Sequence, residues 1–145
     1  MKTGYQPKTR FVNQKQEIFD ALRGRYVTLT PEEAVRQHFI YQLIHLYNYP
    51  AGRIAIETSL KVNHLLKRSD VVVFNKHGQP WMLVECKAPE VKLTQKVFDQ
   101  VNRYNYELKA DYLVLTNGER IITGHLDYEQ NQCKFQNSLP SYPCD

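Results

Sequence analysis

The chain has 145 residues, of which 42% are hydrophobic and 23% are charged, so it is long enough for one globular domain and too apolar for a disordered segment. The net charge of +4, from 19 Lys and Arg against 15 Asp and Glu, permits a nucleic-acid partner without requiring one. No apolar run is long enough for a membrane helix or a secretory signal, so we expect a cytoplasmic protein without membrane contact. The motifs GxxxxGK[ST], GxGxxG, GxSxG and HExxH do not occur, which argues against an ATP motor, a Rossmann enzyme and an α/β-hydrolase. The three cysteines are widely spaced and fit neither a disulfide framework nor a CxxC zinc site.

The first half of the chain predicts an arm followed by helices. Residues 1–16 are polar and basic, and we expect a flexible or loosely docked arm ahead of a single domain over residues 17–145. Helical spacing of apolar residues predicts a short helix over residues 17–23. The segment Thr30-Pro31-Glu32-Glu33 is a capping box with proline at the first helical position, and an apolar stripe continues from it. We therefore predict one long amphipathic helix over residues 31–47.

The rest of the chain predicts a sheet with a second helix inserted. Alternating or continuous apolar residues predict strands over residues 54–62, 69–74, 81–86, 111–116 and 120–123. A helical stripe covers residues 94–109, and the prolines of the tail predict irregular structure. The fold class is therefore α/β: a mixed sheet of four to five strands flanked by helices.

The hairpin between the second and third strands is the most informative feature for chemistry. A turn centred on His77-Gly78 predicts three opposed pairs: Phe74 with Trp81, Val72 with Leu83, and Asp70 with Glu85. Opposed side chains have Cβ atoms about 4.5–5.5 Å apart, where like charges are destabilising. Mg²⁺ takes one or two carboxylates, so a divalent cation between Asp70 and Glu85 would relieve this repulsion.

Lys87 lies two residues after Glu85 and therefore projects from the same face of the strand. Its ammonium group could orient the attacking water or stabilise charge on a scissile phosphate. Asp70, Glu85 and Lys87 are together sufficient for metal-assisted hydrolysis of a phosphodiester. The alternative is a surface salt-bridge cluster on an edge hairpin.

Asp70 followed by Glu85-Cys86-Lys87 resembles the D…(D/E)xK signature of the PD-(D/E)xK nuclease superfamily. More narrowly, the chain resembles the N-terminal nuclease domain of the R protein of type I restriction enzymes over roughly residues 17 to 143. The matching stretches are residues 29–33, 35–38, 67–70, 84–89, 92–95, 98–100, 103–105 and 116–118. A lone D…ExK occurs often by chance, whereas this ordered series is specific.

The resemblance implies a restriction-endonuclease-like αβββαβ core and Mg²⁺-dependent DNA cleavage, with Mn²⁺ as a substitute. It implies that Asp70 and Glu85 bind the metal and that Lys87 is the catalytic lysine. Two further elements follow from it. Gln100 and Tyr104 match a QxxxY element of the second helix, which would position the active site or the nucleic-acid backbone, and Glu33 is the candidate for an additional metal ligand. DNA is the implied substrate, and a dimer on DNA is compatible with double-strand cleavage. One departure is that Ser69, not proline, precedes Asp70.

Several of these residues have a second interpretation. The capping box needs Glu33 whether or not it binds a metal, and Arg36 is either a helix-face charge or a phosphate contact. Tyr104 lies on the apolar stripe and also fits the core. Three basic residues on or near the second helix form either a solvated face or a stripe that contacts nucleic-acid phosphates: Lys92, Lys96 and Arg103.

Two other functions stay open at this stage. The R protein carries an ATP-driven translocase, and nothing in this sequence supplies one. The chain could therefore be a non-catalytic DNA- or protein-binding module that docks onto a separate restriction complex, with motor, specificity or methyltransferase subunits as partners. A remnant of the fold without a nucleic-acid role is the third interpretation, although a remnant has no physical reason to keep opposed carboxylates. Relief of their repulsion predicts that Asp70→Asn raises the stability of the metal-free protein.

Overall fold

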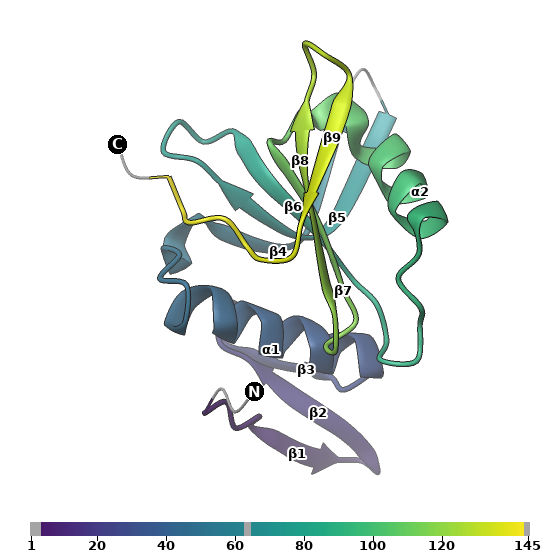
Figure 1. The fold of residues 1–145 in the computed structure, drawn as a ribbon. Coiled ribbons are helices and arrows are strands. Elements are labelled where there is room, and N and C mark those ends of the chain that lie inside the picture. Colours follow the sequence, from purple (N-terminus) through teal and green to yellow (C-terminus); the bar gives the residue numbers. More distant parts are fainter. Residues whose placement is uncertain (1–3, 63–64, 144–145) are drawn as a thin grey trace.

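The computed structural model describes the backbone of residues 4–62 and 65–143, and their side chains apart from those of residues 57–69 and 104. Two sheets and two α-helices make up the described part of the chain (Figure 1). The elements in chain order are β1 (Thr9–Val12), β2 (Lys15–Asp20), β3 (Arg25–Thr28), α1 (Pro31–His45), a 3-10 turn η1 (Ala51–Arg53), β4 (Ile54–Val62), β5 (Leu65–Phe74), β6 (Pro80–Cys86), α2 (Gln95–Asn105), a 3-10 turn η2 (Tyr106–Leu108), β7 (Tyr112–Thr116), β8 (Ile121–Asp127) and β9 (Gln132–Gln136).

The larger sheet has six strands in the order β4-β5-β6-β7-β8-β9. Only the β6–β7 pair is parallel among the strands described, and the connection between these two strands carries α2. Helix α1 lies along one face and α2 along the other (Figure 1). This arrangement confirms the predicted α/β class with a mixed sheet between helices.

Successive residues of the central strands face opposite helices, because side chains alternate along a strand. Val71 and Val84 pack with α1, whereas Val72 and Leu83 pack with Phe98 of α2. Both faces of the central strands are therefore buried, as their continuous apolar sequences predicted.

Helix α1 begins where the capping box predicted. The Thr30 hydroxyl accepts a hydrogen bond of 3.0 Å from the backbone N–H of Glu33, and Pro31 occupies the first turn. The helix ends at His45, two residues before the predicted end. Helix α2 is capped by Thr94 in the same way and ends at Asn105, where a 3-10 turn replaces the predicted last turn.

The helix predicted over residues 17–23 was wrong. Strand β2 covers residues 17–20 and pairs with β1 and β3 in a three-stranded sheet, and residues 21–24 form the turn to β3. Residues 9–12 and 15–16, in the segment expected to be a flexible or loosely docked arm, are strand residues of the same sheet. The burial of Ile18 and Asp20, with exposed residues before them, has the two-residue period of a strand. Asn13 and Gln14 both have positive φ, which closes the β1–β2 hairpin with a two-residue turn.

Two further details differ from the prediction. The tail contains a sixth strand, β9, which pairs with β8 and extends the sheet by one strand. A register shift between Val73 and Phe74 pairs Phe74 with Pro80, so the predicted Phe74–Trp81 pair was wrong, whereas the Val72–Leu83 pair is confirmed. Within residues 4–62 and 65–143, no helix is long and apolar enough to cross a membrane.

Candidate active site

The candidate site lies where β5 and β6 meet the first turns of α1. The recorded pairs Val72–Leu83 and Val71–Val84 have the predicted register, which continued by one step sets Asp70 opposite Glu85. The Asp70 carboxylate accepts a hydrogen bond of 2.8 Å at Oδ2 from the backbone N–H of Cys86. Strand pairing and this bond together fix Asp70 beside the end of β6.

Glu85 and Lys87 form an ion pair on this end of β6, with Lys87 Nζ 3.0 Å from Glu85 Oε2. Partial burial raises the pKa of Glu85 and the negative charge of Asp70 raises it further, while Lys87 acts in the opposite direction. Burial favours the neutral amine of Lys87, but the hydrogen bond to Glu85 and its charge outweigh this, so the pKa of Lys87 is raised. The lysine is therefore a stable cation beside two carboxylates.

Cys86, between these two residues, points into the core and is fully buried. Burial raises the pKa of its thiol far above the ordinary value, so the neutral thiol dominates at neutral pH. Cys86 therefore acts as a small buried hydrophobic residue and not as a nucleophile.

Arg36 connects α1 to the sheet. Its Nη1 donates to Glu33 Oε1 at 2.7 Å, and its Nη2 donates to Asp70 Oδ1 at 3.2 Å. Glu33 Oε2 accepts a second bond, of 3.0 Å, from the side chain of Gln37. Although burial opposes the charged form, Glu33 and Asp70 raise the pKa of Arg36. The guanidinium group is thus a permanent, nearly buried charge between two carboxylates.

Two members of this network, Gln37 and Glu32, were not predicted from the sequence. Gln37 orients Glu33, and the negative charge of Glu32 raises the pKa values of both Glu85 and Lys87. The signal for Gln37 was present, because Glu33, Arg36 and Gln37 are three and four residues apart and so share one helix face.

The side chains at this site can supply two carboxylate ligands to Mg²⁺ but not a complete coordination shell. In the part of the chain that the structure describes, no three His, Cys, Asp or Glu side chains form a group that could hold a metal. Asp70 and Glu85 offer two carboxylates, which is the number that Mg²⁺ takes when it keeps several waters. Each Asp70 oxygen accepts one hydrogen bond and has a second lone pair for a cation. The structure does not gather Glu33 with this pair, so a metal role for Glu33 stays a prediction.

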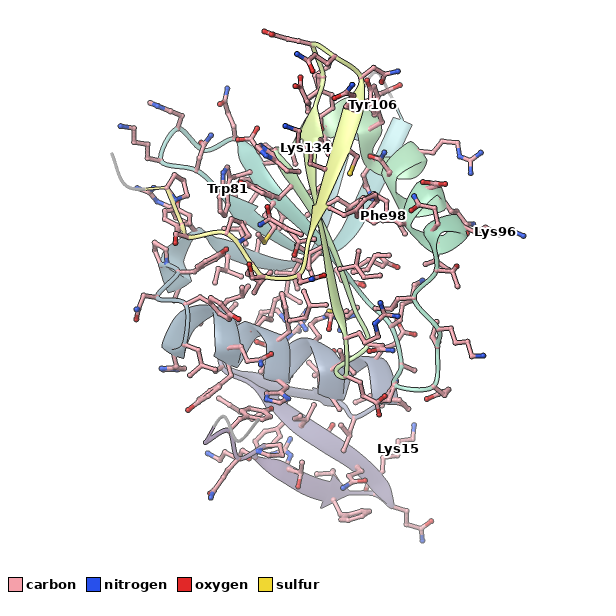
Figure 2. The ribbon with its side chains drawn as sticks, viewed as in Figure 1. Lys15, Trp81, Lys96, Phe98, Tyr106 and Lys134 are labelled. Atoms are coloured by element: carbon pink, nitrogen blue, oxygen red, sulfur yellow. The ribbon has the colours of Figure 1, made fainter. Side chains whose placement is uncertain are left out.

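The other predicted residues do not join this network. Gln100, Lys92, Lys96 and Arg103 are exposed on α2 or on the loop before it, and within the described residues none of them bonds to the network. Figure 2 shows Lys96 at the outer side of α2, pointing away from the sheet. The side chain of Tyr104 lies outside the described residues. Their predicted roles at the active site or toward nucleic acid stay predictions.

This mixed sheet between two helices, with Asp70 on β5 and Glu85-Cys86-Lys87 at the end of β6, has the restriction-endonuclease-like fold of the PD-(D/E)xK class. Residues 31–140 match the family model described as "Type I restriction enzyme R protein N terminus (HSDR_N)". The chain belongs to this family, and the predicted resemblance is confirmed.

A solved structure shares the fold. A candidate nuclease belonging to DUF820 from Anabaena variabilis ATCC 29413 superposes with a TM-score of 0.50 and 12% sequence identity, over 94% of this chain and 83% of that chain. No curated protein matches the chain. The family and the shared architecture support a nuclease-like protein.

Proposed function

We propose that the chain is a metal-dependent DNA endonuclease that hydrolyses phosphodiester bonds with Mg²⁺, or with Mn²⁺ in its place. The observation that carries this proposal is the meeting of Asp70 with the Glu85–Lys87 ion pair at one end of the sheet. Membership of the type I restriction R protein family supports the same chemistry.

Each residue has a defined part in the proposed reaction. Asp70 and Glu85 would hold the cation, which when bound supplies electrostatic stabilisation of the charge that develops on the phosphate. Lys87, held 3.0 Å from Glu85, can hydrogen-bond the attacking water or a phosphate oxygen. Arg36 and Glu33 act as positioning residues, because they reach Asp70 through a chain of hydrogen bonds.

One observation favours a non-catalytic module instead. Both oxygens of Asp70 already accept hydrogen bonds, and Arg36 places a cation on one of them. A site in which Arg36 replaces the metal would keep the fold and bind DNA or a protein of a restriction complex without cleavage. In either case, separate motor, specificity or methyltransferase subunits are the partners that we propose, and the nuclease could act as a dimer on DNA.

Digestion of supercoiled plasmid and single-stranded DNA with Mg²⁺ or Mn²⁺ tests the proposal. The parent protein is compared with Asp70→Asn and Lys87→Ala, and with Lys134→Ala as a control on exposed β9. We expect cleavage by the parent and the control, and a loss of about 100-fold or more in the two site variants. Equal cleavage by Lys87→Ala would refute the catalytic assignment, and inactivity of all four proteins would favour the non-catalytic module.

A further inference from the structure

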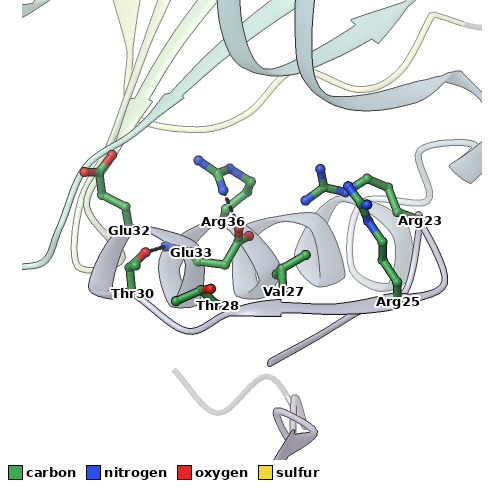
Figure 3. A pocket seen from close by; sticks show the side chains of 8 residues that line it. All are labelled: Arg23, Arg25, Val27, Thr28, Thr30, Glu32, Glu33 and Arg36. Carbon is green, nitrogen blue, oxygen red and sulfur yellow. Dashed lines mark hydrogen bonds and ion pairs between the residues drawn. The ribbon is translucent and has the colours of Figure 1, made fainter. Parts of the chain in front are cut away.

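A cavity of about 380 Å³ lies beside the candidate site, between β3, the β2–β3 turn and α1 (Figure 3). Three arginines and two glutamates contribute to its wall: Arg23, Arg25, Arg36, Glu32 and Glu33. Figure 3 shows the side chains of Arg23 and Arg25 projecting to the same side as that of Arg36. The three-stranded sheet, absent from the sequence prediction, therefore brings two further arginines next to the network of the candidate site.

The β2–β3 turn is built around a buried carboxylate. Asp20 has no exposed surface, and its Oδ1 accepts hydrogen bonds of 3.0 Å from the backbone N–H groups of both Leu22 and Arg23. Its Oδ2 pairs with Nε of the Arg23 side chain. A buried charge is stable only when it is paired, so this arrangement fixes both the turn and the direction of Arg23.

At the β2–β3 turn, Arg25 supplies a positive charge that no described side chain neutralises. It is exposed at the start of β3, and no hydrogen bond or ion pair of its side chain occurs among the described residues. In contrast, Glu33 is paired with Arg36, and Asp20 is paired with Arg23. Glu32, the remaining acidic residue of the wall, lies at the other end of the cavity, where its charge acts on Glu85 and Lys87 (Figure 3). The end at the β2–β3 turn therefore has two arginines against the one carboxylate of Asp20, and such a surplus attracts an anion that accepts several hydrogen bonds, for example a phosphodiester.

Charged side chains lie at both ends of the cavity. Arg36 and Glu33 contact the candidate site, while Arg23 and Arg25 lie toward the β2–β3 turn (Figure 3). A strand whose scissile phosphate lay at Asp70 and which followed the cavity would bring a flanking phosphate toward this turn. Preorganisation of Arg23 by Asp20 lowers the entropy that binding costs.

We infer that the cavity at the β2–β3 turn binds the DNA backbone, with Arg25 as its main phosphate contact and Arg23 as a fixed second contact. This inference rests on the proposed function, because it assigns the surface that holds the flanking part of the same substrate. Such contacts are independent of base sequence, so this surface positions the strand and does not select a sequence.

The test is the salt dependence of DNA binding, measured without cleavage. Fluorescence anisotropy of a labelled duplex in EDTA, between about 50 and 200 mM salt, gives the slope of log K against log salt, which changes by about 0.9 for each phosphate contact. We expect Arg25→Gln to weaken binding about 3- to 10-fold and to reduce the slope by about 1. Arg25→Lys keeps the charge and is expected to keep the slope.

Lys134→Gln is the matched control, since it removes one exposed positive charge from β9, the edge strand of the six-stranded sheet, which lies far from β3 in Figure 2. We expect its slope to equal that of the parent protein. If Arg25→Gln and Lys134→Gln bind DNA equally well, the inference is refuted. Inorganic phosphate that binds at this cavity while DNA does not, or a change confined to an RNA duplex, would also overturn it.

The outcomes separate this inference from the proposed function. If the parent protein cleaves DNA and Arg25→Gln has the salt slope of the parent, the inference about the cavity is refuted and the proposed nuclease function stands. If DNA binding depends on Arg25 but no variant and no parent protein cleaves DNA, the nuclease function is refuted and the inference about the cavity stands. A parent protein that neither binds nor cleaves DNA refutes both.

Discussion

The ion pair between Arg36 and Asp70 reverses the sign expected for Asp70→Asn in the metal-free protein. Repulsion between Asp70 and Glu85 alone predicts that removing the charge stabilises the fold. In the structure, Asp70 Oδ1 lies 3.2 Å from Arg36 Nη2, and the side chains are 19% and 7% exposed. Asparagine would lose the charged partner of a nearly buried guanidinium group, so we expect destabilisation.

The size of the effect follows from two opposing contributions. A hydrogen bond to a charged group contributes about 1.5–3 kcal/mol to stability. Relief of the repulsion that raises the pKa of Glu85 returns at most about 1 kcal/mol. Arg36 keeps its bond to Glu33, which limits the loss to about 1–2 kcal/mol net. For a chain of this size that corresponds to a fall in Tm of about 2–8 °C.

Thermal unfolding in EDTA at neutral pH and low salt measures this shift. The double variant with Arg36→Gln should lose less stability than the sum of the two single variants, because both remove the same bond. Asp99→Asn is the control, since Asp99 is exposed on α2 and its change should move Tm by less than about 1 °C. An unchanged or higher Tm for Asp70→Asn would refute the argument from the ion pair and restore the one from repulsion.

Three further predictions concern pH, the N-terminal turn and the core. The raised pKa of Glu85 means that its ionisation opposes folding, so the free energy of unfolding falls as pH rises from about 4.5 through the pKa of the folded state. Glu85→Gln removes the titrating group and should flatten the pH dependence of urea unfolding in that window. A profile unchanged by Glu85→Gln would contradict the raised pKa. Asp20→Ala should lower the free energy of unfolding by about 3 kcal/mol in the same urea assay, because the variant lacks a buried carboxylate that accepts three hydrogen bonds. A loss below about 1 kcal/mol would show that the β2–β3 turn does not depend on Asp20. In Gly124→Ala the new Cβ would lie 2.5 Å from Cζ of Phe98, so we expect the free energy of unfolding to fall by about 2–3 kcal/mol. Gly52→Ala is the control: nothing lies within 4 Å of its new Cβ, so the free energy of unfolding should change by less than about 1 kcal/mol. Equal effects of the two variants would contradict the packing of β8 against α2.

The elements that the sequence predicted well are those whose signals are local. The capping box marked the start of α1, and the turn at His77-Gly78 marked the register of β5 with β6. Register depends on side-chain alternation, so a correct turn placed Val72 opposite Leu83 and brought Asp70 to the end of β6. The bulge at Phe74 left no mark in the sequence, since it changes pairing by one residue near the turn.

The N-terminal sheet was not predictable in the same way. Ile18, Phe19 and Leu22 have a spacing that also fits one turn of helix, and a short apolar segment does not distinguish the two. The β1–β2 turn uses Asn13-Gln14, not the Asn-Gly pair typical of such hairpins. Pairing of β2 with β1 and β3 decided the outcome.

The partners of Arg36 were beyond the reach of sequence patterns. Its spacing from Glu33 indicates a contact within the helix, but the bond to Asp70 joins residues 34 positions apart. That contact exists because α1 packs across β5 and β6, which is a property of the tertiary structure.

The same packing makes the N-terminal sheet part of the site's architecture. Strand β3 ends at Thr28 and α1 begins at Pro31, so only two residues separate the sheet that carries Arg25 from the helix that carries Glu33. The Thr30 cap fixes the backbone of Glu33, Glu33 holds Arg36, and Arg36 reaches Asp70. A displacement of the β2–β3 turn would therefore be transmitted through a short, hydrogen-bonded path to the carboxylate pair. Through this connection, the proposed phosphate contacts at the cavity would position the substrate for the residues of the (D/E)xK motif.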